Sequence, residues 1–166
     1  GARWRDIAAK AHTPEIGVVI DDAMRSIEKE NKRLKDILPK NFARPELDKR
    51  RLGDVVDLFT NIQMHEQGSE KDILGRTYEY CLSKFAEQEG KLAGEFYTPS
   101  CVVRTLVEVL QPYHGRVYDP ACGSGSLLIR AANEAPFEVS IWGQEKEVTT
   151  AGLAKMNLVL HNKAAG

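Results

Sequence analysis

Residues 119–126 read Asp-Pro-Ala-Cys-Gly-Ser-Gly-Ser, and this stretch decides the fold class. It lies between a short strand-forming run, residues 116–119, and a helical pattern over about 124–134. Gly123 and Gly125 let the backbone adopt φ values that a side chain would forbid and pass close beneath a ligand. The helix that follows offers free N–H groups to polar atoms. A strand, a glycine loop and a helix in this order predict a nucleotide-type cradle.

The residues around this loop alternate between helix and strand patterns. We expect a helix over about 99–110, with Val102, Val103, Leu106 and Leu110 as its apolar stripe, a second strand over 139–142, and a last helix over about 147–161. This order is typical of the opening of a doubly wound α/β sheet. Such sheets usually hold about five or more strands, so we expect the polypeptide to continue past Gly166 or another chain to cover the open edge.

The N-terminal half has helical periodicity only. Apolar stripes recur at three- and four-residue spacing within residues 16–27, 52–62 and 73–85, and Thr13 is predicted to cap the first of these helices, with Pro14 in its first turn. Two glycines interrupt the pattern within residues 89–94. We therefore predict a helical domain over residues 1–88 and the first half of a Rossmann-like α/β domain over 89–166.

Composition and charge argue against a membrane protein, a strongly basic nucleic-acid-binding protein and a metal-binding protein. With 42% hydrophobic and 28% charged residues and no apolar run of roughly 18, the chain is expected to be a cytoplasmic globular protein without a membrane span. A net charge of -1 does not mark a strongly basic nucleic-acid binder. Cys81, Cys101 and Cys122 lie far apart and are expected to be reduced thiols, and no histidine lies at metal-ligand spacing, so no metal site is predicted.

The loop itself narrows the choice of ligand. A dinucleotide fingerprint needs a third glycine where Leu128 stands, and no Gly-Lys-Ser/Thr follows as a phosphate loop would require. Asp119 ends the first strand, and Glu145 ends the second, 20 residues after Gly125. In this topology an acid at that place accepts hydrogen bonds from ribose hydroxyls. A surface acid in a strand-to-helix turn is the alternative interpretation of Glu145.

A third motif, Gly-Glu-Phe-Tyr-Thr-Pro at residues 94–99, precedes the helix over 99–110. Thr98 is predicted as its N-cap and Pro99 as its first residue. Free N–H groups and the positive dipole end there would suit a carboxylate, and Phe96 and Tyr97 could offer rings to an adenine. The alternative is an ordinary cap with an aromatic staple.

These motifs, followed by Gly-Gln-Glu at 143–145 and by residues 152–162, resemble the modification subunits of type I restriction-modification systems. Residues 20–35 and 74–80 resemble the N-terminal helical domain of the same subunits. The resemblance implies S-adenosylmethionine as cofactor and transfer of its methyl group to the N6 amino group of adenine in DNA. The cofactor contacts and loop positions implied by the family are Glu95, Phe96, Tyr97, Thr98, Pro99, Ser100, Asp119, Gly123, Ser124, Gly125, Ser126 and Glu145. Ser126 departs from the glycine that many relatives have.

The family's catalytic Asn-Pro-Pro-Phe/Tyr motif does not occur in these residues. Methylating a base in a duplex requires a pocket for the extruded base, so no catalytic residue is assigned and the 166 residues alone are expected to be inactive. The family's partners are a specificity subunit that reads DNA, a second modification subunit and a restriction subunit. A non-catalytic helical module that docks on the specificity subunit is the alternative function. A nicotinamide-dependent oxidoreductase would need the missing third glycine.

Overall fold

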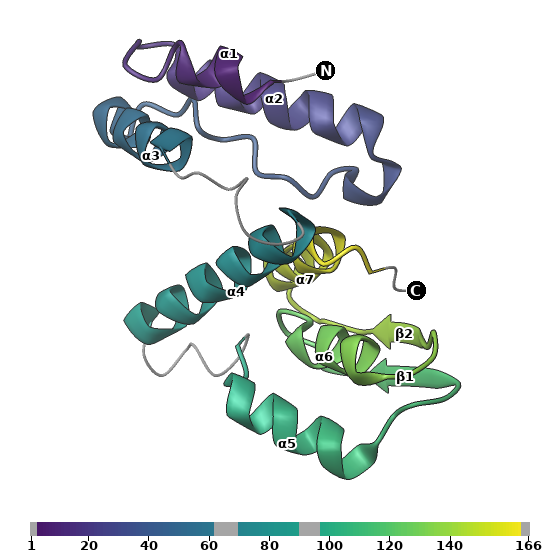
Figure 1. The fold of residues 1–166 in the computed structure, drawn as a ribbon. Helices are drawn as coiled ribbons and strands as arrows, with labels where there is room; N and C mark the ends of the chain where they lie inside the picture. The colour runs from purple at the N-terminus through teal and green to yellow at the C-terminus, as the bar shows by residue number, and fades with distance from the viewer. Residues whose placement is uncertain (1–2, 62–69, 90–96, 164–166) are drawn as a thin grey trace. The chain divides into compact units, whose positions relative to one another are not determined.

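The computed structural model describes residues 3–61, 70–89 and 97–163. The chain forms two compact units, Gly1–Glu66 and Gln67–Gly166. The described residues are mostly helical, with one small parallel sheet in the second unit (Figure 1). No described helix is long and apolar enough to cross a lipid bilayer.

The described part of the first unit, residues 3–61, contains the helices α1 (Trp4–Ala8), α2 (Ile16–Glu30) and α3 (Lys49–Asn61), with a short 3-10 helix at Lys32–Leu34. Part of the predicted stripes forms its core, in which Ile16, Ile20 and Val56 are buried together with Ala11. Val55 and Phe59 of the second stripe are instead 47% and 37% exposed. The predicted cap is wrong. Helix α2 begins at Ile16 with Glu15 at the N-cap position, because the Thr13 hydroxyl instead donates to the Lys10 carbonyl at 2.8 Å.

A buried carboxylate fixes the chain that follows α2. Asp21 is 3% exposed, and its two oxygens accept hydrogen bonds from the backbone N–H groups of Phe42 at 2.9 Å and Ala43 at 3.1 Å. Gly17, one turn earlier on α2, has no room for a Cβ because the Phe42 backbone lies directly against it. The irregular segment through Phe42 is therefore held closely on α2.

The second unit contains the predicted sheet. Strands β1 (Arg116–Asp119) and β2 (Ser140–Gly143) pair in parallel, from Arg116 opposite Ser140 to Asp119 opposite Gly143. Helix α6 (Ser126–Glu134) connects the two strands (Figure 1). Leu128 and Ile129 of α6 form a buried cluster with Ile141 of β2 and Leu158.

The described residues of the second unit also form the helices α4 (Glu70–Glu89), α5 (Ser100–Leu110) and α7 (Val148–Leu160). Helix α5 packs on α6, and α7 follows β2. Helix α4 packs on α7, where the Tyr78 hydroxyl donates to the Leu153 carbonyl at 3.2 Å. Burial raises the pKa of Tyr78 to about 12, with a smaller contribution from Cys81. Because α4 packs on α7, the units divide between residues 66 and 67, whereas the sequence predicts a domain boundary at 88 and 89.

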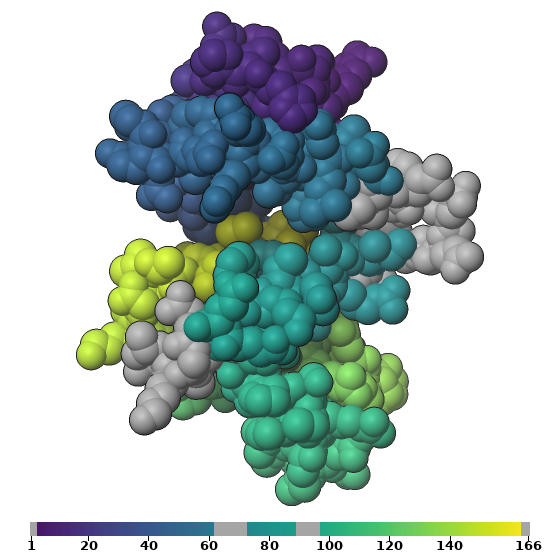
Figure 2. Space-filling model, turned by 90° about the vertical axis from the view of Figure 1, so that its left-hand side faces the viewer, coloured from purple at the N-terminus to yellow at the C-terminus, as the bar shows by residue number. Residues whose placement is uncertain are grey.

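The predicted stripe of α5 is only partly correct. Val103 and Val107 are its buried residues, whereas Val102, Leu106 and Leu110 are 45%, 41% and 67% exposed. Val103 and Val107, four residues apart, lie on one face of α5 and are buried where α5 packs on α6, whereas the other apolar side chains of α5 remain exposed to solvent. Helix α5 accordingly contributes to the outer surface of this unit (Figure 2).

Candidate functional site

The carboxyl ends of the two parallel strands meet at one edge of the sheet. Beyond the last paired residues, the Gln144 N–H donates to the Asp119 carbonyl at 2.9 Å, and the Cys122 N–H donates to the Gln144 carbonyl at 2.9 Å. These bonds continue the pairing into the two loops. Asp119, the last residue of β1, and Glu145, two residues after β2, therefore lie at the same edge of the sheet, where parallel sheets of this kind bind ligands.

The glycine loop has the backbone conformation that its glycines permit. Gly123 has φ 52° and Gly125 has φ 77°, both in the left-handed region. Gly125 is the N-cap of α6, and a Cβ there would meet Ala154 at an ordinary 3.5 Å. At Gly125 it is thus backbone conformation, and not crowding by neighbours, that requires glycine.

Glu145 holds the loop to the second strand. One oxygen of its carboxylate accepts the Gly123 N–H at 3.0 Å, and the other accepts the Glu147 N–H at 2.9 Å. Asp119 acts locally, accepting the Ala121 N–H at 3.0 Å. Cys122 lies half-buried in the same loop, and burial, followed by the charges of Asp119 and Glu145, raises the pKa of its thiol.

Asn157 of α7 forms a hydrogen bond to the backbone of the glycine loop. It is fully buried, and its side-chain amide donates to the Ser124 carbonyl at 3.0 Å. Its Oδ1 atom is buried without a hydrogen-bond partner. Ser124 is 2% exposed, with its hydroxyl 3.0 Å from that of Ser126. The sequence interpretation did not assign this role, although a polar residue in the apolar run of residues 156–160 was a visible signal.

The start of α5 differs by one residue from the prediction. The helix begins at Ser100, and Pro99, not Thr98, occupies the N-cap position, where the N–H groups of Val102 and Val103 bond to its carbonyl. Proline has no side-chain acceptor, so no side-chain cap forms. Glu95 and Phe96 lie outside the described residues.

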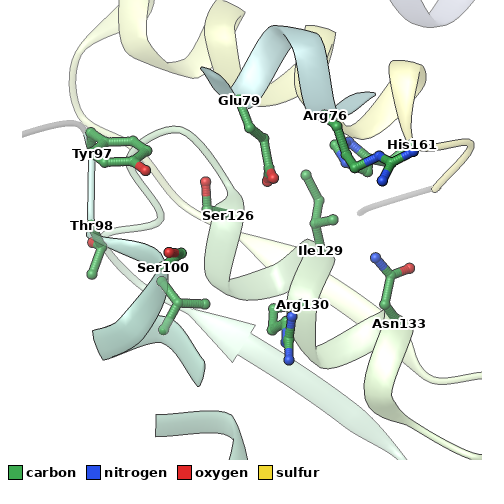
Figure 3. Close-up of a pocket in the computed structure, with 11 residues that line it drawn as sticks. Arg76, Glu79, Tyr97, Thr98, Ser100, Ser126, Ile129, Arg130, Asn133 and His161 are labelled. Atoms are coloured by element: carbon green, nitrogen blue, oxygen red, sulfur yellow. The ribbon is translucent and has the colours of Figure 1, made fainter. Parts of the chain in front are cut away.

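A cavity of about 270 Å³ opens between α4, the start of α5 and α6 (Figure 3). Four of the predicted cofactor residues line it: Tyr97, Thr98, Ser100 and Ser126. The remaining lining residues were not predicted: Arg76, Glu79, Val103, Ile129, Arg130, Asn133 and His161. Asp119, Gly123 and Glu145 do not line the cavity. The predicted residues therefore form one group in the cavity and one at the glycine loop, and Ser126, which follows the loop directly, lines the cavity as well. The additional residues come from α4, α5 and α6 and from His161 just after α7, which only the tertiary fold brings together.

Both signs of charge are present in the cavity. Burial raises the pKa of the Glu79 carboxyl, and the charges of His161 and Arg130 oppose that rise. Burial, followed by the charge of Glu79, raises the pKa of Tyr97. Arg130 is paired with Glu134 at 2.7 Å, while its Nε is buried without a partner. The cavity therefore combines a partly desolvated acid with cations and hydroxyl groups.

Two family models and several known proteins match the chain. Residues 69–165 match the family model described as N-6 DNA Methylase, and residues 1–59 match the HsdM N-terminal domain. The chain is 38% identical over 165 residues to the type I restriction enzyme MjaIX methylase subunit of Methanocaldococcus jannaschii, covering 95% of this chain and 30% of the relative. It is 38% identical to the HindI methylase subunit of Haemophilus influenzae, covering 87% and 36%.

A solved structure has the same fold. The type I restriction-modification methyltransferase subunit from Streptococcus thermophilus superposes with a TM-score of 0.75 at 24% sequence identity, covering 97% of this chain and 36% of that one. The chain thus spans about a third of the length of the proteins it matches. On these matches the chain belongs to the N-6 DNA methylase family, among the methylase subunits of type I restriction enzymes.

Proposed function

We propose that this chain forms the first part of the cofactor site of a subunit that transfers a methyl group from S-adenosylmethionine to the N6 amino group of adenine in DNA. The observation that carries this proposal is the juxtaposition of Asp119, Glu145 and the left-handed glycine loop at one edge of the sheet. Bound there, the cofactor supplies a methyl group on a positively charged sulfur. The residues of this chain bind and orient it.

The residues present fit the cofactor. Gly123 and Gly125 keep side chains away from the space above the loop, and Glu145 is placed to accept ribose hydroxyls. The Glu145 carboxylate uses one acceptor position on each oxygen for Gly123 and Glu147, and a carboxylate offers about four. It can therefore accept ribose hydroxyls without releasing the loop.

The cavity beside the loop is suited to one part of the cofactor. Sites for whole small molecules usually measure about 300–1,000 Å³. At about 270 Å³, the cavity lined by Thr98, Ser100 and Ser126 has room for a group at one end of such a molecule. We assign it to the methionine end, with the adenosine over the glycine loop and near Glu145.

The acceptor site and the partners follow from the family. These residues contain no Asn-Pro-Pro motif, so none of them is assigned to the pocket for an extruded adenine. The relatives are named as subunits of type I restriction enzymes. We propose that this subunit likewise works with a specificity subunit that contacts DNA, a second modification subunit and a restriction subunit. A net charge of -1 accords with DNA reading by another polypeptide.

Methyl transfer by the complete subunit, assembled with its specificity subunit, tests this function. Labelled S-adenosylmethionine and genomic DNA that lacks modification are incubated with the complex, and the DNA is digested to nucleosides. We expect label in N6-methyldeoxyadenosine. Label only in methylated cytosine, or none at all, would contradict the proposal.

Replacing the ribose acceptor tests the site itself. Glu145→Ala in the complete subunit is expected to weaken cofactor binding by roughly 1–3 kcal/mol, the cost of leaving buried hydroxyls unpaired. Glu138→Ala, an exposed acid just before β2, is the matched control. Equal affinity of the two variants in calorimetry would remove Glu145 from the site.

A further inference from the structure

Glu79 lies in the cofactor region although no cofactor motif contains it. It belongs to α4, outside the glycine loop and the residues that precede α5. Figure 3 shows its carboxylate directed from α4 toward Ser126, at the start of α6. Tyr97 also lines the cavity, and burial, followed by the charge of Glu79, raises the pKa of Tyr97. An acid from a neighbouring helix thus faces the end of the glycine loop.

Hydroxyl groups and a helix start line the same cavity. Thr98 lies two residues before α5, Ser100 is the first residue of α5, and Ser126 is the first residue of α6. Hydroxyl donors and the N–H groups of a first helical turn bind carboxylates. The cavity therefore offers an acceptor with negative charge and, across from it, donors suited to a negative group.

The charge state of Glu79 favours a cationic ligand. Its carboxyl is partly removed from water, which disfavours the ionised form, while the charges of His161 and Arg130 favour that form. A partly desolvated carboxylate gains from a charge-assisted hydrogen bond to an ammonium group.

We propose that Glu79 binds the α-ammonium group of the methionine end of S-adenosylmethionine, while Thr98, Ser100 and the first turn of α5 bind its α-carboxylate. This inference rests on the function proposed above. An α-amino acid is the group that requires an acceptor and a set of donors a few ångströms apart, and the volume of about 270 Å³ has room for it and little more. Glu79 is then a ligand-binding residue supplied by the helix that precedes the known motifs.

Two ligands that differ only at this end provide the test. S-Adenosylhomocysteine carries the amino acid group, and methylthioadenosine has the same adenosine and thioether without it. We expect Glu79→Gln in the complete subunit to weaken binding of S-adenosylhomocysteine roughly 10- to 100-fold, as for loss of a charge-assisted hydrogen bond, and to leave methylthioadenosine binding unchanged. Glu108→Gln, an exposed acid on α5 paired with Arg104, is the control and should change neither affinity.

The outcomes separate the inference from the proposed function. If Glu79→Gln weakens the binding of both ligands equally, or of neither, Glu79 does not bind the ammonium group and the inference fails. Its carboxylate then only offsets the charges of Arg130 and His161. If the wild-type subunit binds neither ligand, the proposed function fails. A second test changes the ligand instead of the protein, so it does not depend on whether a variant folds. Wild-type protein should bind deaminated S-adenosylhomocysteine roughly 10- to 100-fold more weakly than S-adenosylhomocysteine itself. Equal affinity for the two compounds would overturn the assignment.

Discussion

Asn157→Ala is the substitution with the clearest expected effect on the glycine loop. The buried amide donates to the Ser124 carbonyl at 3.0 Å, and Ser124 is 2% exposed, so its carbonyl would lose a bond out of reach of bulk water. Such a loss costs about 1–3 kcal/mol. A water-sized gap of about 30 Å³ would add roughly 0.7 kcal/mol, and removing the unpaired Oδ1 would return part of this. We therefore expect the local stability of the loop to fall by about 1–3 kcal/mol.

Hydrogen exchange at the loop amides measures this change directly. A loss of about 1–3 kcal/mol corresponds to exchange that is roughly 5- to 150-fold faster at Cys122 and Gly125, whose N–H groups are bonded to the Gln144 and Cys122 carbonyls. Asn157→Asp keeps the shape, removes the donor and should show the same acceleration. Asn61→Ala, at an exposed position in the first unit, is the control. Unchanged exchange in both Asn157 variants would refute the proposed anchoring of the loop.

Three further substitutions test other contacts. Gly143→Ala should lower the free energy of unfolding by about 1–3 kcal/mol in urea denaturation, because a Cβ would lie 2.9 Å from the side chain of buried Leu128. An unchanged free energy of unfolding would contradict this close packing of β2 on α6. Asp21→Asn should cost about 1–3 kcal/mol by placing an amide group against the N–H groups of Phe42 and Ala43, whereas stability equal to wild type would argue against the two bonds. Burial raises the pKa of Glu79 in the folded protein, so the stability it contributes is present at acidic pH and is lost as pH rises through that pKa. Glu79→Gln should therefore gain stability relative to wild type between acidic and neutral pH in thermal denaturation, and a constant difference would contradict the shift.

The elements around the glycine loop were predictable because their signals are local. Strand β1 lies where the pattern places it, and β2 is displaced by one residue. Glycines in the left-handed region and acids at strand ends follow from chain geometry, so Gly123, Gly125 and Glu145 could be named from spacing. The helical first unit and the two parallel strands agree with the prediction, whereas the doubly wound sheet that these strands would open stays a prediction.

The remaining features depend on tertiary contacts. Thr13 and Thr98 both have cap-forming side chains, yet one bonds to Lys10 and the other yields the N-cap position to Pro99, because capping depends on the exact path of the chain. Glu79 and Asn157 reach the site only through the packing of α4 and α7. Nothing in the spacing of Glu79 relates it to the glycine loop, and for that reason it was missed.

A crystal structure of the complete subunit with S-adenosylhomocysteine tests the central claim most directly. The account predicts the ribose hydroxyls within hydrogen-bond distance of Glu145, the thioether above Gly123 and Gly125, and the amino acid group in the cavity between Glu79 and Ser100. Ligand density away from this edge of the sheet, or a ribose whose hydroxyls bond to groups other than Glu145, would contradict it.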